Sequence, residues 1–370
     1  MLRYLNRLRI SKNTVEIRLA TYNILKSGLF SHINTKFAQK NDMINQVNIK
    51  NFKSIKDITF SCKKLNVFIG EPNSGKSNIL EALSLQSQNA IGDNLNEKMF
   101  RYKTIGDLFY DFNINKPIEI NSNVRNTVLK YGIRENGAPE NQFTFLLDSV
   151  KDIDQPVYIA HDGKILHNSN SGKTDVHLYE YKRLSKFSQD YLPHLSVPNG
   201  ENLPSLLLSN SEYKKWVSDF LKSKNLTLTL KPTENEILAS KIVEGEIYSY
   251  PYFSLSETLQ RIIFYTIAIK SNKENVILLD EPESNTFPFY TKILAERIAL
   301  DETNQFFIAT HNPYLLLSLI EKSNQNDLNV CIVQMKDYQT SITVLKPAQV
   351  SEVLELNSDV FFNFDKILDL

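Results

Sequence analysis

The chain has 370 residues, with 42 acidic and 42 basic side chains and a formal net charge of zero at neutral pH. This length is enough for one large core or two smaller ones, and we expect two lobes. Because the charges balance, the protein as a whole has no strong electrostatic attraction for nucleic acid or for an anionic membrane, although a local basic patch could still bind either one.

No apolar run reaches the ~18 residues that a membrane span requires, and the basic N-terminus lacks the compact apolar segment of a secretory signal. The two cysteines, Cys62 and Cys331, lie in apolar, strand-like surroundings without a second Cys or His at metal-ligand spacing. We therefore expect a cytoplasmic protein with no membrane partner and with two buried thiols in a reducing compartment.

The first strand pattern begins directly after Met43, so residues 1–42 are expected to be an N-terminal extension outside the core. Residues 48–60 predict two strands joined by a turn, and residues 65–69 predict a third, buried strand that ends at Gly70. Residues 78–85 place apolar side chains on one helical face. The order over residues 43–110 is therefore strand, glycine-bounded loop and helix.

Residues 111–250 are expected to form an inserted lobe rich in β-hairpins and helix. Short alternating segments at 118–120, 127–131, 143–147, 156–160 and 176–179 predict antiparallel strands. The turn pairs Asn136-Gly137 and Asp162-Gly163 separate some of them. Residues 203–221 predict one helix, and residues 226–230 predict a further strand.

Residues 251–320 show the alternation of strands and helices that is typical of a parallel sheet. Ser256 begins a helix that continues to Ile269, and residues 288–298 predict a second helix. Buried strands at 276–279 and 305–309 end in polar residues. Residues 321–370 are expected to supply C-terminal strands and a tail.

Residues 70–77, with the sequence GEPNSGKS, match the phosphate-binding loop (Walker A) pattern in full, between a buried strand and a helix. Such a loop directs backbone N–H groups and a helix dipole at phosphate oxygens. Lys76 is expected to contact the terminal phosphates, and the Ser77 hydroxyl is expected to bind Mg²⁺. We assign ATP binding to the residues of this loop and its exit, which are Gly70, Pro72, Asn73, Ser74, Gly75, Lys76, Ser77 and Asn78.

A second Gly-Lys-Thr sequence at residues 172–174 lacks the first glycine of the pattern, because His167 stands in its place. The residues after it alternate as in a strand. We interpret this segment as a hairpin tip that does not bind phosphate.

Asp280 and Glu281 follow four buried apolar residues, so both carboxylates are expected at the C-terminal edge of a sheet, where α/β folds bind ligands. In this Walker B position Asp280 would hold Mg²⁺ through water, and Glu281 would orient or deprotonate the attacking water. Glu283 adds a third carboxylate, either solvated or in contact with the metal shell. Together with Lys76, Glu281 is a candidate catalytic residue for ATP hydrolysis.

His311 ends the next buried strand, and Asn312-Pro313 then turn the chain away from the sheet. An imidazole at this position can reach the terminal phosphate and respond to its loss. A lone histidine is more often structural, but its place beside the carboxylate strand predicts a catalytic role for His311.

Together these residues resemble the ATPase heads of the ABC superfamily, in the soluble branch with SMC, RecF and OLD-type bacterial ATPases, including stand-alone AAA-type ATPases of bacterial defence modules. The resemblance covers residues 43 to about 317 apart from the middle. It depends on residues 49–54, the phosphate loop, residues 280–283 and residues 309–312. It implies an α/β P-loop NTPase fold of the ABC-ATPase type: a mixed sheet, an antiparallel β-rich section and a helical lobe.

The resemblance also implies a signature segment at residues 254–261, in which Ser256 contacts the terminal phosphate of ATP held by another subunit. The glycine pair of transporters is replaced by Glu257 and Thr258, and a plain helix cap at Ser256 is the alternative. Relatives often have a histidine where this chain has Asn285. The usual glutamine that senses magnesium has no evident counterpart, and Lys53 matches a basic residue that touches phosphate.

With such a signature, hydrolysis requires two heads around two ATP molecules, in a dimer or a higher oligomer. Residues 90–250 lack the heptads of an SMC arm, and about fifty residues after Leu317 are too few for a nuclease domain of usual size. We therefore expect a switch subunit that regulates a separate effector, such as a nuclease or toxin, in anti-phage defence. The alternative is a RecF-like or SMC-like ATPase that binds DNA during repair; a membrane-transport motor and a kinase are less favoured.

Overall fold

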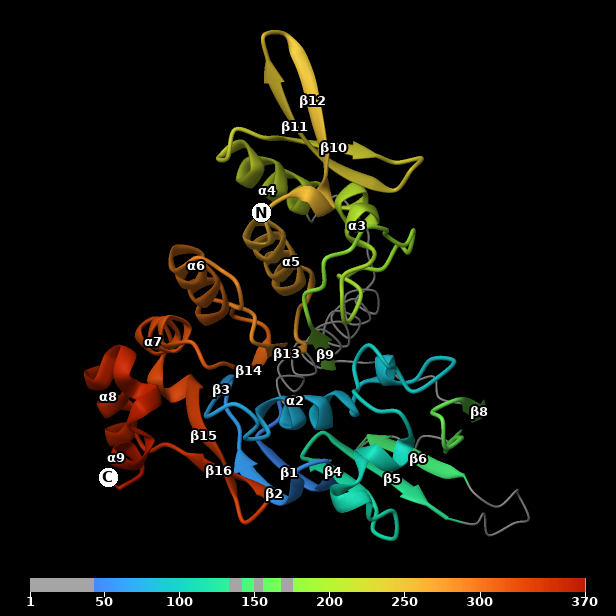
Figure 1. The fold of residues 1–370 in the computed structure, drawn as a ribbon, viewed down its shortest axis with the longest axis vertical. Helices are drawn as coiled ribbons and strands as arrows, with labels where there is room; N and C mark the ends of the chain where they lie inside the picture. Colours follow the sequence, from blue (N-terminus) through green and yellow to red (C-terminus); the bar gives the residue numbers. More distant parts are fainter. Residues whose placement is uncertain (1–42, 133–141, 150–155, 168–175, 370) are drawn as a thin grey trace, which may run out of the picture. The chain divides into compact units, whose positions relative to one another are not determined.

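The computed structural model describes residues 43–132, 142–149, 156–167 and 176–369. Contacts group Ile44–Leu370 into one compact unit. Its centre is a six-stranded core sheet with the order β16-β15-β3-β14-β13-β9, in which the edge strand β16 alone is antiparallel to its neighbour (Figure 1). The strands are β3 (Leu65–Ile69), β9 (Val176–Tyr179), β13 (Val276–Asp280), β14 (Gln305–Ala309), β15 (Leu328–Lys336) and β16 (Gln339–Val344).

The core-sheet strands have nearly continuous apolar sequences because both faces of the sheet are covered. In β3, Val67 and Ile69 face one hydrophobic cluster while Phe68 faces the other. The first cluster includes side chains from α5 (Glu257–Ser271), α6 (Pro288–Ala299) and α7 (Pro313–Lys322). The second cluster includes α2 (Lys76–Ser84), which contacts β9, β13 and β14.

A second, antiparallel sheet lies beyond α2, which also contacts its strand β1 (Figure 1). Its order is β2-β1-β4-β5-β6-β7-β8. The strands are β1 (Gln46–Phe52), β2 (Ile55–Ser61), β4 (Ile118–Ser122), β5 (Arg125–Tyr131), β6 (Phe143–Ser149), β7 (Val157–Ile159) and β8 (Ile165–His167). Because β4 pairs with β1, this sheet continues across the boundary that we expected at residues 110 and 111.

The position of β9 differs from the sequence prediction, which placed residues 176–179 among the antiparallel strands. In the structure β9 runs parallel to β13, with Tyr179 opposite Leu279. All four of its residues are buried. A short strand covered on both faces has no alternation that would show which sheet it joins.

The helical lobe also differs from its prediction, because two helices replace the single one expected over residues 203–221. They are α3 (Leu203–Ser209) and α4 (Ser211–Lys222). Asn210 separates them and caps α4, since its side chain accepts hydrogen bonds from the amides of Glu212 and Tyr213.

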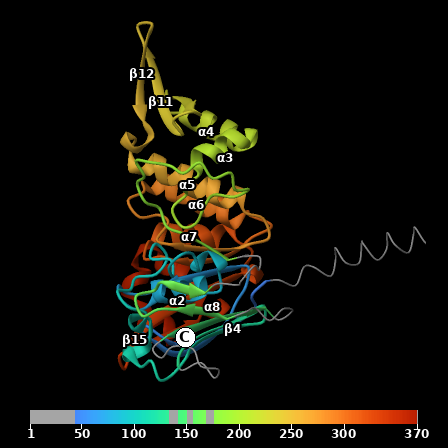
Figure 2. The same ribbon diagram turned by 90° about the vertical axis from the view of Figure 1, so that its right-hand side faces the viewer.

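A small three-stranded antiparallel sheet follows α4 and precedes α5. It contains β10 (Thr227–Lys231), β11 (Glu236–Val243) and β12 (Glu246–Pro251). The β11–β12 hairpin was not predicted from the sequence. Its two turn residues, Glu244 and Gly245, have φ angles of 52° and 87°. Two positive φ angles are typical of a type I′ turn, and Figure 2 shows the hairpin projecting away from α4 and α5.

The C-terminal region contains helices in addition to the expected strands. After β16 the chain forms α8 (Pro347–Leu356), a 3-10 helix (Asn357–Phe362) and α9 (Phe364–Leu368). Further 3-10 helices are Gln88–Ala90, Ile105–Leu108, Tyr110–Phe112, Tyr252–Ser254 and Gln325–Asp327. Val353 and Ile367 bury their side chains in the same cluster as α5, so these helices are part of the core.

The two thiols of Cys62 and Cys331 are buried and not bonded to each other, as expected. Burial raises the pKa of both, and that of Cys331 reaches about 12. Within the described ranges, no helix combines the length and the apolar character needed to cross a bilayer. The Gly-Lys-Thr sequence at 172–174 and the turn Asn136-Gly137 lie outside the described residues.

Candidate functional site

The C-terminal ends of the parallel strands bring the predicted motifs together at one edge of the core sheet. The register pairs Phe68 of β3 with Ala309 of β14, and Ala309 with Asp280 of β13. The phosphate loop follows β3 directly, Asp280 ends β13 and is followed by Glu281, and His311 lies two residues after the end of β14. Segments more than two hundred residues apart in the sequence therefore meet at this edge.

The two outer glycines of the loop have no room for a side chain. A Cβ at Gly70 would lie 2.1 Å from the carbonyl oxygen of Val333, and one at Gly75 would lie 2.1 Å from Thr340 Oγ1. Gly75 also has a φ of 103°, which other residues rarely adopt. These steric limits explain why the pattern requires glycine at both positions.

Two hydroxyl groups from distant elements support the loop. Thr340 Oγ1 on β16 donates to the carbonyl oxygen of Ser74 at 3.1 Å and lies 2.7 Å from Ser54 Oγ. The Asn78 amide also donates to Ser54 Oγ, at 2.7 Å. Asn78, predicted to bind nucleotide, therefore uses its amide to hold the loop against the turn between β1 and β2.

Lys76 begins α2 and directs its buried ammonium group back over the loop. Its Nζ donates to the carbonyl oxygens of Gly70 at 3.0 Å and Glu71 at 2.7 Å. Burial lowers the pKa of Lys76, while the carboxylates of Glu281, Asp280 and Glu71 act in the opposite direction. Lys76 is thus within electrostatic reach of the acidic pair that follows β13.

Asp280 has the features of a cation ligand. Burial raises its pKa to about 6, and a hydrogen bond from Ser77 opposes that shift. Its Oδ1 atom is buried and has no hydrogen-bond partner in the part of the chain that the structure describes. A buried carboxylate oxygen with no donor beside a serine hydroxyl fits Mg²⁺, which prefers hard oxygen ligands.

The described residues contain no cluster of three or more His, Cys, Asp or Glu side chains that could hold a metal alone. A site with one carboxylate and one hydroxyl is nevertheless common for Mg²⁺ bound with a nucleotide, because phosphate oxygens and water complete the shell. Ser77 and Asp280 are therefore the residues that would hold the ion.

Glu281 is held in a defined orientation by two hydrogen bonds. Its Oε1 lies 2.7 Å from Nδ1 of His311, and Ser284 Oγ donates to its Oε2 at 3.2 Å. Its backbone has a φ of 43°, and its amide donates to the carbonyl oxygen of Ala309. Residues other than glycine adopt this left-handed conformation less readily.

Glu283, whose role the sequence left open, lies in the interior with only 3% of its surface exposed. It accepts a hydrogen bond from Thr310 Oγ1 and so connects the segments that follow β13 and β14. Burial raises its pKa to about 7, well above 4.5, and the Thr310 hydroxyl partly opposes the shift. Glu283 is therefore not solvated; its Oε1 is bonded to Thr310, while its buried Oε2 has no hydrogen-bond partner among the described residues.

The Glu283→Gln protein is expected to gain stability over the native protein as the pH rises. The pKa of Glu283 is higher in the folded protein than in the unfolded chain. The stability that the protonated Glu283 side chain contributes is therefore fully present below about pH 4.5, and it is lost as the pH rises through about 7. The native and Glu283→Gln proteins should differ little in free energy of unfolding at pH 5. At pH 8 the Glu283→Gln protein should be more stable by roughly 3 kcal/mol. Urea denaturation without nucleotide measures this difference; Glu302→Gln is the exposed control, and an equal difference at both pH values would contradict the interpretation.

Arg101, which no motif indicated, lies close to this site. Its Nε bonds to Glu81 at 2.5 Å, its Nη2 donates to Asn78 at 3.3 Å, and its charge lowers the pKa of Asp280. Glu81 also pairs with Lys53, so the Lys53 ammonium is bound to a carboxylate here. Arg101 belongs to a loop whose sequence has no recognisable pattern, so its position near Asp280 could not be predicted from the sequence.

Glu180 was also missed by the sequence analysis. It follows β9 directly, and because Tyr179 pairs with Leu279, it lies level with Asp280 at the sheet edge. Its charge raises the pKa of Asp280. Its position depends on β9 belonging to the core sheet, which the sequence did not indicate.

Ser256 occupies the N-cap position of α5, but its side chain makes no capping hydrogen bond, and the residue is exposed. Asn285, which lies four residues after Glu281, bonds to both residues that follow Ser256. Its Nδ2 donates to Glu257, and its backbone carbonyl oxygen accepts from Thr258 Oγ1. The start of α5 is thus held to the segment after β13, while the Ser256 side chain makes no capping hydrogen bond.

A family model described as an AAA ATPase domain matches residues 43–247, more than half of the chain. The match includes the phosphate loop and ends before Asp280, Glu281 and His311, so their positions rest on the geometry above. No curated protein matches the chain.

The chain is similar to solved SMC heads. One was solved with the C-terminal winged-helix domain of ScpA (17% identity, TM-score 0.48, covering 84% of this chain and 99% of that one). Another is from Thermotoga maritima (14% identity, TM-score 0.39, covering 82% and 99%). A third has an extended coiled coil and the C-terminal domain of ScpA, derived from Pyrococcus furiosus (14% identity, TM-score 0.46, covering 84% and 98%).

The expectation of a P-loop NTPase fold is confirmed by the complete phosphate loop between a parallel strand and its helix, and by the family match. The predicted ATPase relationship is confirmed at the level of that family. The chain belongs to the AAA ATPase domain family.

Proposed function

We propose that this protein binds ATP with Mg²⁺, hydrolyses it, and uses the cycle as a conformational switch between paired heads. The observation that carries the proposal is the meeting of Lys76, Asp280 and Glu281 at one sheet edge. A phosphate-binding loop beside a carboxylate pair is the arrangement that phosphoryl transfer to water requires.

The chemistry follows from the groups in place. Lys76 exchanges its bonds with the Gly70 and Glu71 carbonyls for the terminal phosphates, while the amides at the start of α2 bind phosphate oxygens. When bound, Mg²⁺ neutralises charge on the phosphate oxygens. Glu281 accepts the proton of the attacking water, and His311 holds the carboxylate in position through Nδ1.

Two features support the pairing of heads around ATP. The Ser256 hydroxyl does not cap its own helix and is exposed. Exposed aromatic residues also lie close in sequence to the site motifs: Phe253 precedes the signature, Phe287 follows the carboxylates, and Tyr314 follows His311, with 64% of Phe287 and 54% of Tyr314 exposed. A second head that closes over the site would cover these side chains.

The biological output is the second part of the proposal. The sequence resembles ATPase heads that act on other proteins, so we propose that closing and opening of the heads regulates a separate effector in anti-phage defence. Cleavage of ATP then changes the population of two conformations, and the effector responds to that change.

Mixing two inactive variants tests whether one site is shared by two copies. Ser256→Arg keeps the phosphate loop and lacks the signature hydroxyl, and Lys76→Ala has the opposite defect. Each is expected to be inactive alone, while their mixture should regain ATP hydrolysis because one composite site is complete. Ser351→Arg is the matched surface control.

Two results would contradict head pairing. One is full activity of Ser256→Arg alone, and the other is a mixture that stays inactive although both variants are folded. Simple ATP binding by one head would then be the function that remains.

A further inference from the structure

The tip of the β11–β12 hairpin exposes an apolar pair. Ile242 and Ile247 lie opposite each other in the register, and 69% of each side chain is exposed. Two glutamates, Glu244 and Glu246, flank the turn glycine Gly245 and are also exposed. The tip therefore presents two aliphatic side chains directly beside two carboxylates.

This hairpin has its own stabilising contacts, so the exposure of the isoleucines is part of its folded form. Ser240 and Ser249 are linked across the strands by a hydroxyl contact of 2.8 Å. On the other face, the Lys241 ammonium lies over the rings of Tyr248 and Tyr250, at 5.9 and 5.5 Å from their centroids. A hairpin that is already ordered loses little conformational entropy when it inserts into a partner.

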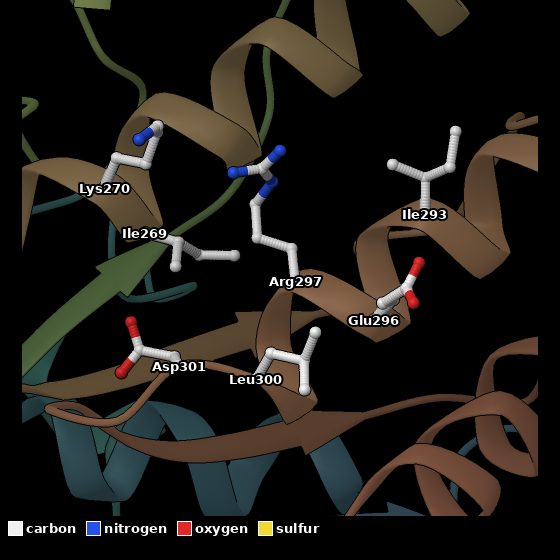
Figure 3. A pocket seen from close by; sticks show the side chains of 7 residues that line it. All are labelled: Ile269, Lys270, Ile293, Glu296, Arg297, Leu300 and Asp301. Carbon is white, nitrogen blue, oxygen red and sulfur yellow. The ribbon is translucent and has the colours of Figure 1, made fainter. Parts of the chain in front are cut away.

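A pocket of about 410 Å³ lies between α5 and α6 (Figure 3). Its apolar lining comes from Ile269, Ile293 and Leu300. Its charged lining consists of Lys270, Glu296, Arg297 and Asp301. Figure 3 shows Arg297 near the middle of this group, rising from α6 between Lys270 and Ile293.

Three of the four charged residues already have partners. Lys270 pairs with Glu212 at 2.7 Å, and Glu296 pairs with Lys322 at 3.6 Å. Asp301 Oδ1 accepts hydrogen bonds from the amides of the turn that follows it. None of these three requires a ligand.

Arg297 differs from them. Its guanidinium lies over the ring of Trp216, 5.2 Å from the centroid, and among the described residues it has no carboxylate partner. Its Nε atom is buried and, within the same residues, has no hydrogen-bond acceptor. A partly buried guanidinium that lacks an acid is a favourable site for a carboxylate.

We propose that the hairpin tip of a second copy of this chain inserts into the α5–α6 pocket. The carboxylate of Glu244 or Glu246 pairs with Arg297, while Ile242 and Ile247 pack on the apolar lining. The tip supplies the carboxylate that Arg297 lacks, and both surfaces present aliphatic side chains. Reciprocal insertion closes a dimer, and one-way insertion builds a chain of copies.

The proposed contact goes beyond the function proposed above, because neither the pocket nor the tip includes a residue of the nucleotide site. It therefore forms without ATP. If the heads do not pair around ATP, the proposed hairpin contact is unaffected. If the hairpin contact does not form, the proposed pairing of heads around ATP is unaffected.

Sedimentation of the intact chain without nucleotide tests the proposal. The native protein is expected to self-associate. Arg297→Glu, and separately the double change Glu244→Lys with Glu246→Lys, should each weaken association on the order of 30-fold or more, because like charges meet at the contact. Mixing the two variants should restore association, since the reversed charges then match between copies.

Further variants keep the result interpretable. Ile247→Asp should also abolish association, Glu302→Lys should not, and thermal unfolding shows that each variant is folded. The proposal is overturned if the native protein sediments as a monomer up to about 100 μM. It is equally overturned if the two folded charge variants stay monomeric when mixed.

Discussion

Replacing Glu281 with Gln is expected to lower kcat for ATP hydrolysis by roughly 10²–10⁴-fold, the usual contribution of a general base. Glutamine has the same shape and can still accept from Ser284, but it cannot take a proton from water. ATP binding should change little, because the phosphate loop is intact. Phosphate release at saturating ATP and Mg²⁺ measures kcat, and calorimetric titration measures ATP affinity.

Glu302→Gln, at an exposed position, is the matched control and should keep native kcat. A Glu281→Gln protein with kcat within a few-fold of the native value would show that another group activates the water. Glu180, which lies level with Asp280 at the sheet edge, would then be the next candidate.

Replacing Lys76 with Ala is expected to lower kcat/KM for ATP by about 10³-fold or more, since both ground-state and transition-state contacts are lost. The native ammonium is buried beside two carbonyl oxygens and within electrostatic reach of three carboxylates, so no other cation takes its place readily. Titration with a fluorescent ATP analogue measures the loss of binding, and phosphate release measures the loss of activity.

Lys50→Ala is the control for charge and size, because Lys50 lies on β1 in a surface pair with Glu119. It should behave as the native protein does. Native ATP affinity in the Lys76→Ala protein would contradict the role of the loop in binding phosphate.

The sequence predicted the phosphate loop because its pattern is local. Gly70, Gly75 and Lys76 stand within one run of eight residues and match the pattern there, although the steric limits at the two glycines come from Val333 and Thr340 far along the chain. Asp280 and Glu281 were predicted for a similar reason, since four buried apolar residues before them indicate a strand end at a sheet edge.

What the sequence could not give depends on contacts between distant segments. The bond between Glu281 and His311 requires β13 and β14 in one register, and Glu180 joins the edge only because β9 pairs with β13. Arg101 approaches Asp280 from a loop that has no periodicity.

Local chemistry was also misread in the helical lobe. Asn210 ends one helix and caps the next, although the apolar periodicity continues through it. The turn at Glu244 and Gly245 was not recognised, and the β11–β12 hairpin was missed with it. Both errors come from one or two residues whose backbone role outweighs the pattern around them: the cap Asn210 in one case and the turn Glu244-Gly245 in the other.

The most direct measurement is a crystal structure of the Glu281→Gln protein with ATP and Mg²⁺. We predict one triphosphate whose terminal phosphate lies within about 3.5 Å of Lys76 Nζ, with a water between that phosphate and the side chain at position 281. A triphosphate bound to the loop while position 281 lies on the far side of the nucleotide, out of reach of that water, would contradict the account.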